Sequence, residues 1–426
     1  MDMSYTSLEQ LPPNRRVTFD EDPEIALYLP ENDTKDPELS IVIPAMNEEA
    51  VMELFIEWCH EGINKAGVAA EILIVDSSSD RSPLIALEGG ARVLKTPKRG
   101  LGQAYRNAIQ VIRGKYIIMG DADCTYDFRE ISPFMERFRE GYEFILGSRF
   151  KGSIEDGSMP ALHRYFGTPF TTWILNTIYG SDFSDIHCGM RGITLDALKR
   201  IRLHSRSWEY ASEMVIKSVR VGLRRVEVPV HFYKDRDGRE SHHRRMGWFS
   251  PWHAGWINLR AMLIYGADFF VLRPGSVLFA LGLLATLLLA LGPVSLGGVT
   301  LSLNSQFLAM IAAVAGLQGL MSGAIAQILF EPTGESARRW LGRLPYTRTM
   351  IGVGIVFSIG VMLCINFVWS FVNAGYTVVD AMARDNHLAV LGLTMMILSF
   401  TVFIGTLLIH AVAARTLTGS PDADAR

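Results

Sequence analysis

The chain has 426 residues, enough for two or three domains, and its averages of 49% hydrophobic and 20% charged residues hide a division near Pro274. Most charged side chains precede this proline, and long apolar runs follow it. The net charge of −3 and the lack of a basic stripe with interleaved aromatics give no reason to expect a nucleic-acid partner. The four cysteines form no CxxC pair, which favours reduced cytosolic thiols over a zinc site or disulfides.

Residues 1–38 form an N-terminal extension without the apolar run of a cleavable signal peptide, so we expect the polar half of the chain to stay in the cytosol. Residues 39–240 then alternate between short β-branched runs and helical segments; the runs are LSIVIP, EILIVD, ARVLKT and KYIIMGDAD. This alternation predicts a parallel sheet wrapped by helices. Ligands bind such sheets beyond the carboxyl ends of the strands, so the polar residues there are the candidate site.

Two carboxylates follow the apolar run YIIMG, as Asp121-Ala122-Asp123. Carboxylates are ligands of Mg²⁺ and Mn²⁺, and such an ion can bridge a diphosphate and neutralise the charge of a departing nucleotide. A DxD pattern alone occurs in many surface loops. Its place after a buried strand, with Asp76 ending another strand upstream, makes a metal and nucleotide site the better interpretation.

Residues 241–273 contain an amphipathic juxtamembrane pattern. Trp252, Trp256, Leu259 and Leu263 recur at spacings of four, three and four, which places them on one face of a helix. Tryptophans beside arginines and a tyrosine are typical of the lipid headgroup region. The segment therefore predicts an interfacial helix, with an ordinary packed helix as the alternative.

Four apolar stretches in residues 274–412 are long enough to cross a bilayer, which takes about 20 helical residues. They run from about Ser276 to Val294, Gln306 to Phe330, Met350 to Val372 and Leu388 to Val412, and a tail follows at 413–426. The alternative is a helical core of a large soluble protein, which four nearly uncharged runs disfavour. Glycines 316, 319 and 323 would permit close helix packing, including packing in a homo-oligomer.

The loop charges predict the orientation of these spans. The connection between the second and third spans carries Arg338, Arg339, Arg343 and Arg348, whereas the loop after the first span has no charge. The positive-inside rule places this arginine loop, the polar domain and both termini in the cytoplasm. The sequence thus predicts a multi-pass protein of the cell membrane.

Several segments of the polar half resemble one known family when they are taken in order. They are IVIPAMNEE, EILIVDSSSD, KRGLGQAYRNA, MGDADCTYDF, ILGSRF, DIHCGMRG and RRVEVPVHFY. Together they resemble the family 2 glycosyltransferases of GT-A fold, and most closely the polyprenyl-phosphate sugar synthases that are dolichyl-phosphate mannose or glucose synthase-like. The resemblance implies an α/β GT-A domain, here followed by an interfacial helix and an α-helical transmembrane module.

The resemblance also implies roles for individual residues. Asp121 and Asp123 correspond to the metal-binding pair for Mg²⁺ or Mn²⁺, and Arg149 and Arg164 to residues that grip the acceptor phosphate. Asp123, Arg149 and Arg164 are thus the expected catalytic residues. The expected nucleotide-sugar-binding residues are Pro44, Asn47, Glu48, Asp76, Lys98 and Asp121. Thr125 departs from the family, because close relatives have a glutamine there as a further metal contact.

Each of three groups of residues has two possible interpretations. Lys98, Arg99, Gly100 and Gly102 either approach the diphosphate, or the glycine starts a helix and the charges are solvated. Asp185, Arg191 and Glu213 have either an ion-pair role or a substrate role. Arg236, Arg239, Ser241 and His242 either close over the donor or form a solvated linker.

The function implied is transfer of a sugar from a UDP- or GDP-sugar to polyprenyl phosphate in one metal-dependent inverting step. The acceptor phosphate is already anionic and needs no strong general base. The partners expected are the donor, the lipid acceptor and membrane lipids. Alternatives are transfer to another lipid or glycan acceptor, a processive polysaccharide synthase, or a non-catalytic nucleotide-sugar-binding scaffold. The synthase is disfavoured because residues 336–340, SARRW, lack the glutamine of its QxxRW motif.

Overall fold

A computed structural model describes residues 8–236, 256, 259, 260, 262–331, 333–376 and 384–418. The chain divides into two compact units, Met1–Met262 and Leu263–Arg426, and each is described by itself. Of the predicted juxtamembrane helix, Trp252 lies outside the described residues, as do Arg239, Ser241 and His242 of the polar loop. The described positions from Trp256 to Tyr265 are helical, and both Trp256 and Leu263 are exposed.

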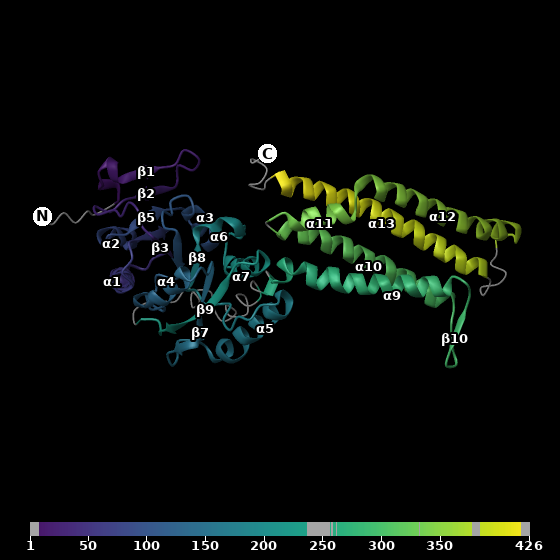
Figure 1. The fold of residues 1–426 in the computed structure, drawn as a ribbon, viewed down its shortest axis with the longest axis horizontal. Coiled ribbons are helices and arrows are strands. Elements are labelled where there is room, and N and C mark those ends of the chain that lie inside the picture. The colour runs from purple at the N-terminus through teal and green to yellow at the C-terminus, as the bar shows by residue number, and fades with distance from the viewer. Residues whose placement is uncertain are drawn as a thin grey trace. The chain divides into compact units, whose positions relative to one another are not determined.

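The first unit is built on a nine-stranded sheet with the order β1-β2-β5-β4-β3-β6-β8-β7-β9 (Figure 1). The strands are β1 (Arg16–Thr18), β2 (Ala26–Tyr28), β3 (Leu39–Ala45), β4 (Ala70–Asp76), β5 (Arg92–Lys95), β6 (Tyr116–Met119), β7 (Phe144–Ile154), β8 (Arg191–Thr194) and β9 (Arg225–Phe232). The predicted parallel pairing is found in β5-β4-β3-β6 and in β7-β9. The sheet as a whole is mixed, because β8 runs antiparallel to both β6 and β7.

The helices of this unit are α1 (Glu49–Ala66), α2 (Ser82–Glu88), α3 (Leu101–Ala108), α4 (Ser132–Arg139), α5 (Thr168–Tyr179), α6 (Leu195–Ile201) and α7 (Tyr210–Arg220). Short 3₁₀ turns lie at η1 (Leu8–Gln10), η2 (Pro13–Arg15) and η3 (Phe128–Glu130), and a π-helical turn, η4 (His163–Gly167), precedes α5. Ile41, Val42 and Ile43 of β3 are fully buried, as expected for a central strand covered on both faces. The α/β fold predicted from the alternating pattern is confirmed.

The N-terminal extension takes part in the sheet rather than standing apart from it. Strand β2 pairs antiparallel with β5, and its residues Ala26, Leu27 and Tyr28 are buried. Strand β1 pairs with β2 and forms the outer edge. The boundary predicted at residue 39 therefore marks the first parallel strand and not the start of the folded unit.

The second unit contains the helices α9 (Arg273–Leu289), α10 (Leu303–Phe330), α11 (Glu335–Arg343), α12 (Tyr346–Asn373) and α13 (Arg384–Thr418) (Figure 1). A π-helical turn, η6 (Asp268–Leu272), leads into α9, and a hairpin of β10 (Val294–Leu296) and β11 (Val299–Leu301) joins α9 to α10. Among the described residues, four helices are long and apolar enough to cross a membrane: Asp268–Leu289, Leu303–Phe330, Tyr346–Asn373 and Arg384–Leu417.

Two features of this unit differ from the sequence-based expectation. The first span was expected to reach Val294, but its helix ends at Leu289, because Gly292 has a φ of 128° and Pro293 cannot continue a helix. The arginine loop was expected to be a simple connection, but it contains the short helix α11.

The glycines noted in the second span pack within the chain. A Cβ on Gly316 would lie 2.2 Å from the Phe279 backbone nitrogen of α9, and one on Gly275 would lie 2.8 Å from the Leu320 nitrogen of α10. A Cβ on Gly323 would lie 2.4 Å from the Leu272 side chain. These glycines allow α9 and η6 to approach α10 closely, so they supply no argument for a homo-oligomer.

Candidate active site

The ends of β3 and β4 are joined by a hydrogen-bond network around Ser78. The Ser78 hydroxyl donates to Asp76 Oδ1 over 2.5 Å and accepts from the backbone N–H of Asn47 over 2.8 Å. Asn47 adopts a left-handed φ of 58°, and its side-chain oxygen accepts from the N–H of Ser79. The structure therefore brings Asn47 and Asp76, two predicted nucleotide-binding residues, to one edge of the sheet.

Asp76 is fully buried, and Lys95 lies against it. Lys95 Nζ is 2.5 Å from Asp76 Oδ2, in an ion pair across neighbouring strands, because Asp76 and Lys95 are directly opposite in the β4-β5 register. The sequence alone indicated no role for Ser78 or Lys95. The signal for Lys95 was its place at the end of the run ARVLK, which is the strand next to the one that Asp76 ends.

The other two predicted residues of this edge are Pro44 and Glu48. Pro44 is the penultimate residue of β3 and is half-buried, and Glu48 precedes α1 and is 6% exposed. The backbone N–H of Glu48 donates to the Ser82 hydroxyl of α2 over 2.9 Å. This bond again ties the turn after β3 to the turn after β4.

The two carboxylates of the DxD pattern lie in a constrained loop after β6. Asp123 Oδ1 accepts from both the N–H and the hydroxyl of Thr125, over 3.0 and 2.6 Å, and Cys124 has a left-handed φ of 57°. A Cβ on Gly189 would lie 2.6 Å from Asp121 Oδ2, so only a glycine permits this approach. Gly189 is held in place by its N–H, which donates to the Tyr126 hydroxyl over 2.8 Å.

Asp121 and Asp123 are the two carboxylates that this loop offers to a divalent ion. Among the described residues, no group of three or more histidine, cysteine or acidic side chains is placed to hold a metal. The chain would thus contribute Asp121 and Asp123, and phosphate oxygens and water would complete the shell, as Mg²⁺ sites in phosphate-binding proteins do. Thr125, the departure from the family pattern, here orients one of the two carboxylates.

Two buried tyrosines lie near Asp121. The rings of Tyr105 and Tyr210 are 4.7 Å apart, and the Tyr105 hydroxyl donates to the Gly120 carbonyl next to Asp121. Burial raises the pKa of Tyr210 to about 12, with the Asp121 charge contributing in the same direction. Both phenols therefore stay neutral, and the two packed rings support the loop that carries Asp121.

Arg149 lies in β7 and is buried against Asp185. Its Nε and Nη2 donate to the two carboxylate oxygens of Asp185 over 2.7 and 2.8 Å, and its guanidinium lies over the Phe232 ring. Burial opposes ionisation of Asp185, but the bonds from Arg149 outweigh it and hold the pKa of this carboxyl below its ordinary value. Of the two interpretations of Asp185, the structure supports the ion pair.

Arg164 occupies a different setting, on the π-helical turn η4. Its side chain is half-buried, with the guanidinium over the Tyr165 ring. Neighbouring apolar side chains are strongly exposed, namely Tyr165 at 74% and Trp173 at 61%. Arg149 and His163 both lower the pKa of His187, so β7 and η4 both lie near this histidine.

The segment around Lys98 has a structural role at most of its positions. Arg99 forms ion pairs with Asp22 and Glu24 of the N-terminal extension. A Cβ on Gly100 would lie 2.3 Å from the Arg206 carbonyl oxygen, and one on Gly102 would lie 2.4 Å from the Ser205 carbonyl oxygen. Lys98 itself is exposed.

The loop that these glycines approach is held by Glu213, which is fully buried on α7. Its carboxylate accepts from the N–H groups of His204 and Ser205 over 2.9 and 2.8 Å and pairs with Lys217 over 2.6 Å. Arg191 likewise serves the backbone, donating to the carbonyls of residues 186, 188 and 211. Glu213 and Arg191 thus position loops around the site.

Comparison with known proteins gives two family matches. Residues 40–202 match a model described as glycosyl transferase family 2, and residues 325–413 match one described as the glycosyltransferase family 2 C-terminal transmembrane region. A low-salt glycan biosynthesis hexosyltransferase of Haloferax volcanii is 33% identical over 85% of this chain and 88% of its own length. A dolichyl-phosphate hexose transferase of the same organism is 30% identical over 40% of this chain and 72% of its own.

Among solved structures, mannosyl-3-phosphoglycerate synthase from Rubrobacter xylanophilus aligns with a TM-score of 0.41. It is 20% identical, over 53% of this chain and 72% of that one.

Proposed function

The chain belongs to glycosyltransferase family 2, and from that premise we propose that it transfers a hexose from a UDP- or GDP-sugar to membrane-embedded polyprenyl phosphate. It is a membrane glycosyltransferase related to hexosyltransferases of Haloferax volcanii. The observation that carries the proposal is the presence in one chain of a carboxylate loop after β6 and four helices that are long and apolar enough to cross a membrane. The similarity to a dolichyl-phosphate hexose transferase supports the choice of acceptor.

The proposed donor site lies along the ends of β3, β4 and β6. Pro44, Asn47, Glu48 and Asp76 would bind the nucleotide, and Asp121 and Asp123 would hold Mg²⁺ or Mn²⁺ against its diphosphate, with Lys98 as a further positive charge. Asp76, which is fully buried against Ser78 and Lys95, would hold the turn after β4 in place, and it would reach the nucleotide only if its carboxylate became accessible. The metal would supply charge neutralisation on the leaving diphosphate.

The proposed acceptor site uses Arg149 and Arg164. Since Arg149 Nε and Nη2 bind Asp185, Nη1 is the nitrogen that would reach a phosphate oxygen, and Asp185 would orient the guanidinium for this contact. Arg164 lies on η4 beside exposed aromatic side chains, and it would bind the phosphate of a lipid. An oxygen of the acceptor phosphate would attack the anomeric carbon as the bond to the diphosphate breaks, with inversion. No proton has to be removed in this step.

We propose a GT-A domain at 39–240 that is extended by strands β1 and β2, a juxtamembrane region at 241–273, and spans at 274–412. The first span begins earlier, at Asp268, and α13 continues to Thr418, into the expected tail at 413–426. The exposed arginines of residues 338–348 favour a cytoplasmic position for this end of the bundle. The catalytic domain and both termini would then be cytoplasmic, where nucleotide sugars are made available.

The test is an assay of the purified full chain in detergent with Mn²⁺, polyprenyl phosphate and a panel of UDP- and GDP-sugars. We expect lipid-dependent release of nucleoside diphosphate from one donor, a glycosylated lipid by mass, and loss of both in Asp123→Ala. If donor cleavage requires a different lipid or a glycan, that molecule would replace polyprenyl phosphate as the proposed acceptor. Nucleotide-sugar binding without turnover on any acceptor would favour the scaffold.

A further inference from the structure

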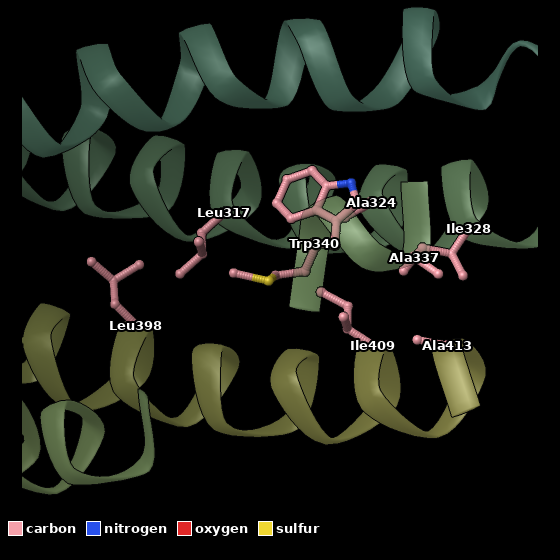
Figure 2. Close-up of a cluster of buried hydrophobic side chains, with 9 residues drawn as sticks. Leu317, Ala324, Ile328, Ala337, Trp340, Leu398, Ile409 and Ala413 are labelled. Carbon is pink, nitrogen blue, oxygen red and sulfur yellow. The ribbon is translucent and has the colours of Figure 1, made fainter. Parts of the chain in front are cut away.

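The arginine-bearing helix α11 is attached firmly to the end of the membrane bundle. Trp340 is 7% exposed, and its indole N–H donates to Gln327 Oε1 of α10 over 3.0 Å. Ala337 is fully buried in the same cluster, which includes Ala324 of α10 and Ile409 of α13. Figure 2 shows these side chains filling the space between α10 and α13. The apolar face of α11 is thus buried against α10 and α13.

Both ends of α11 are also tied to α13. At its start, a Cβ on Gly334 would lie 3.1 Å from Leu417, and after its last turn the Leu344 carbonyl lies 2.9 Å from His410 Nε2. Helix α11 therefore runs antiparallel to the final turns of α13. Pro345 follows, and the third span begins directly after it at Tyr346. Because α12 is long and apolar enough to cross a bilayer, α11 would lie where this span leaves the hydrocarbon.

The opposite face of α11 is basic and exposed. The described exposed positions of the helix are Glu335, Arg338, Arg339, Gly342 and Arg343, which recur at the spacing of one helical face. Arg348, in the first turn of α12, is exposed as well. The Arg343 guanidinium lies over the Trp340 ring, 5.3 Å from its centroid, so packing helps to aim this side chain.

We propose that the exposed face of α11 binds the phosphate groups of anionic phospholipids in the leaflet next to it. Two features favour this occupant. Three exposed arginines lie on one face of a packed helix directly before a helix that is long and apolar enough to cross a membrane. Guanidinium groups also bind phosphate through paired hydrogen bonds. Because α11 is packed, its backbone is already fixed before a lipid binds, and only side-chain freedom has to be lost. This face of α11 shares no residue with the proposed donor and acceptor sites, and the inference does not depend on the proposed function.

The test is native mass spectrometry of the full chain in detergent, titrated with phosphatidylglycerol or phosphatidylcholine. We expect the wild type to prefer phosphatidylglycerol. Arg339→Gln and Arg343→Gln should each lower the affinity for phosphatidylglycerol about five-fold, which corresponds to ~1 kcal/mol per arginine near an anionic surface. The matched control is Arg384→Gln, which removes an exposed arginine from the first turn of α13, at the other end of that helix. It should leave the preference unchanged.

Two further arms keep the inference open to contradiction. The double variant Arg339→Lys/Arg343→Lys keeps the charge but loses the paired hydrogen bonds of the guanidinium groups, so its preference should lie between those of the wild type and of Arg339→Gln/Arg343→Gln. A preference equal to that of the double glutamine variant would contradict the role assigned to charge at this face. Polyprenyl phosphate in place of phosphatidylglycerol should bind to the glutamine variants as it does to the wild type. A selective loss of polyprenyl phosphate would make this face an acceptor site instead. A wild type without preference for the anionic lipid would refute the inference outright.

Discussion

At the scale of single residues, the candidate site depends on side chains that orient other side chains. Asp76 is fixed by Ser78 and Lys95, Asp123 by Thr125, and Arg149 by Asp185. In each case the sequence pattern indicated the residue that is expected to touch a ligand, whereas Thr125 stood out only as a departure from the family. Asp185 was noted without a settled role, and Ser78 and Lys95 lay within the quoted motifs but were given no role.

Thr125 should tune the metal affinity of the loop. Its hydroxyl lies 2.6 Å from Asp123 Oδ1, and loss of such an orienting bond typically weakens metal binding 10- to 100-fold. We expect Thr125→Val to raise the Mn²⁺ concentration for half-maximal activity by about this factor. Thr125→Ser keeps the hydroxyl and should stay close to wild type. An unchanged Mn²⁺ dependence in Thr125→Val would show that this bond does not support the metal.

His187 should make the stability of the first unit depend on pH. Burial lowers its pKa to about 4, against an ordinary value of about 6.5. Between these values the unfolded chain binds a proton that the folded unit excludes, so stability falls as pH drops through this window, by about 3 kcal/mol in total, and this contribution levels off below pH 4. Denaturation midpoints of His187→Asn should fall less between pH 6.5 and 4 than those of the wild type. Parallel curves would contradict the assignment.

At the scale of elements, the membrane unit is organised by close packing of α9 against α10. Gly316 shows the requirement most clearly, because an added Cβ would lie 2.2 Å from a backbone nitrogen of α9. A backbone atom cannot move aside as a flexible side chain can. The helices must separate to admit even a methyl group, and packing between them is lost.

Gly316→Ala should therefore destabilise the membrane unit, by about 1–3 kcal/mol as for other overpacked interiors. Gly352→Ala on α12 is the matched control, since a Cβ there meets no atom within 4 Å. The measurement is the thermal midpoint of the monodisperse peak of detergent-solubilised protein. If both variants lowered the midpoint equally, the effect would belong to glycine replacement in general and not to the α9–α10 contact.

At the scale of the whole molecule, the proposed orientation can be tested at two exposed positions of the second unit. Val299 lies in the β10-β11 hairpin, and Gly342 lies on α11. In intact cells, a membrane-impermeant maleimide should label Val299→Cys, whereas Gly342→Cys should react only after permeabilisation. The native Cys59, Cys124 and Cys188 are buried, so the wild type supplies the background. The reverse labelling pattern would overturn the proposed orientation.

The sequence by itself determined the features that depend on local pattern. Alternating β-branched and helical segments specified the α/β unit, because periodicity reflects which face of an element is buried. Apolar runs of span length specified the membrane helices, because hydrocarbon cannot satisfy an exposed backbone. The order of the short motifs was enough to indicate family 2, which the comparisons confirmed.

Only the tertiary structure decided which distant residues meet. Several contacts join segments that no local pattern relates. They are the antiparallel pairing of β8, the ion pair of Arg149 with Asp185, the approach of Gly189 to Asp121, and the hydrogen bond from Trp340 to Gln327. The sequence does not distinguish an arginine or glycine that contacts a ligand from one that contacts a neighbouring strand. Its role depends on which partner the fold brings within hydrogen-bonding or van der Waals distance, because these interactions act over only a few ångströms.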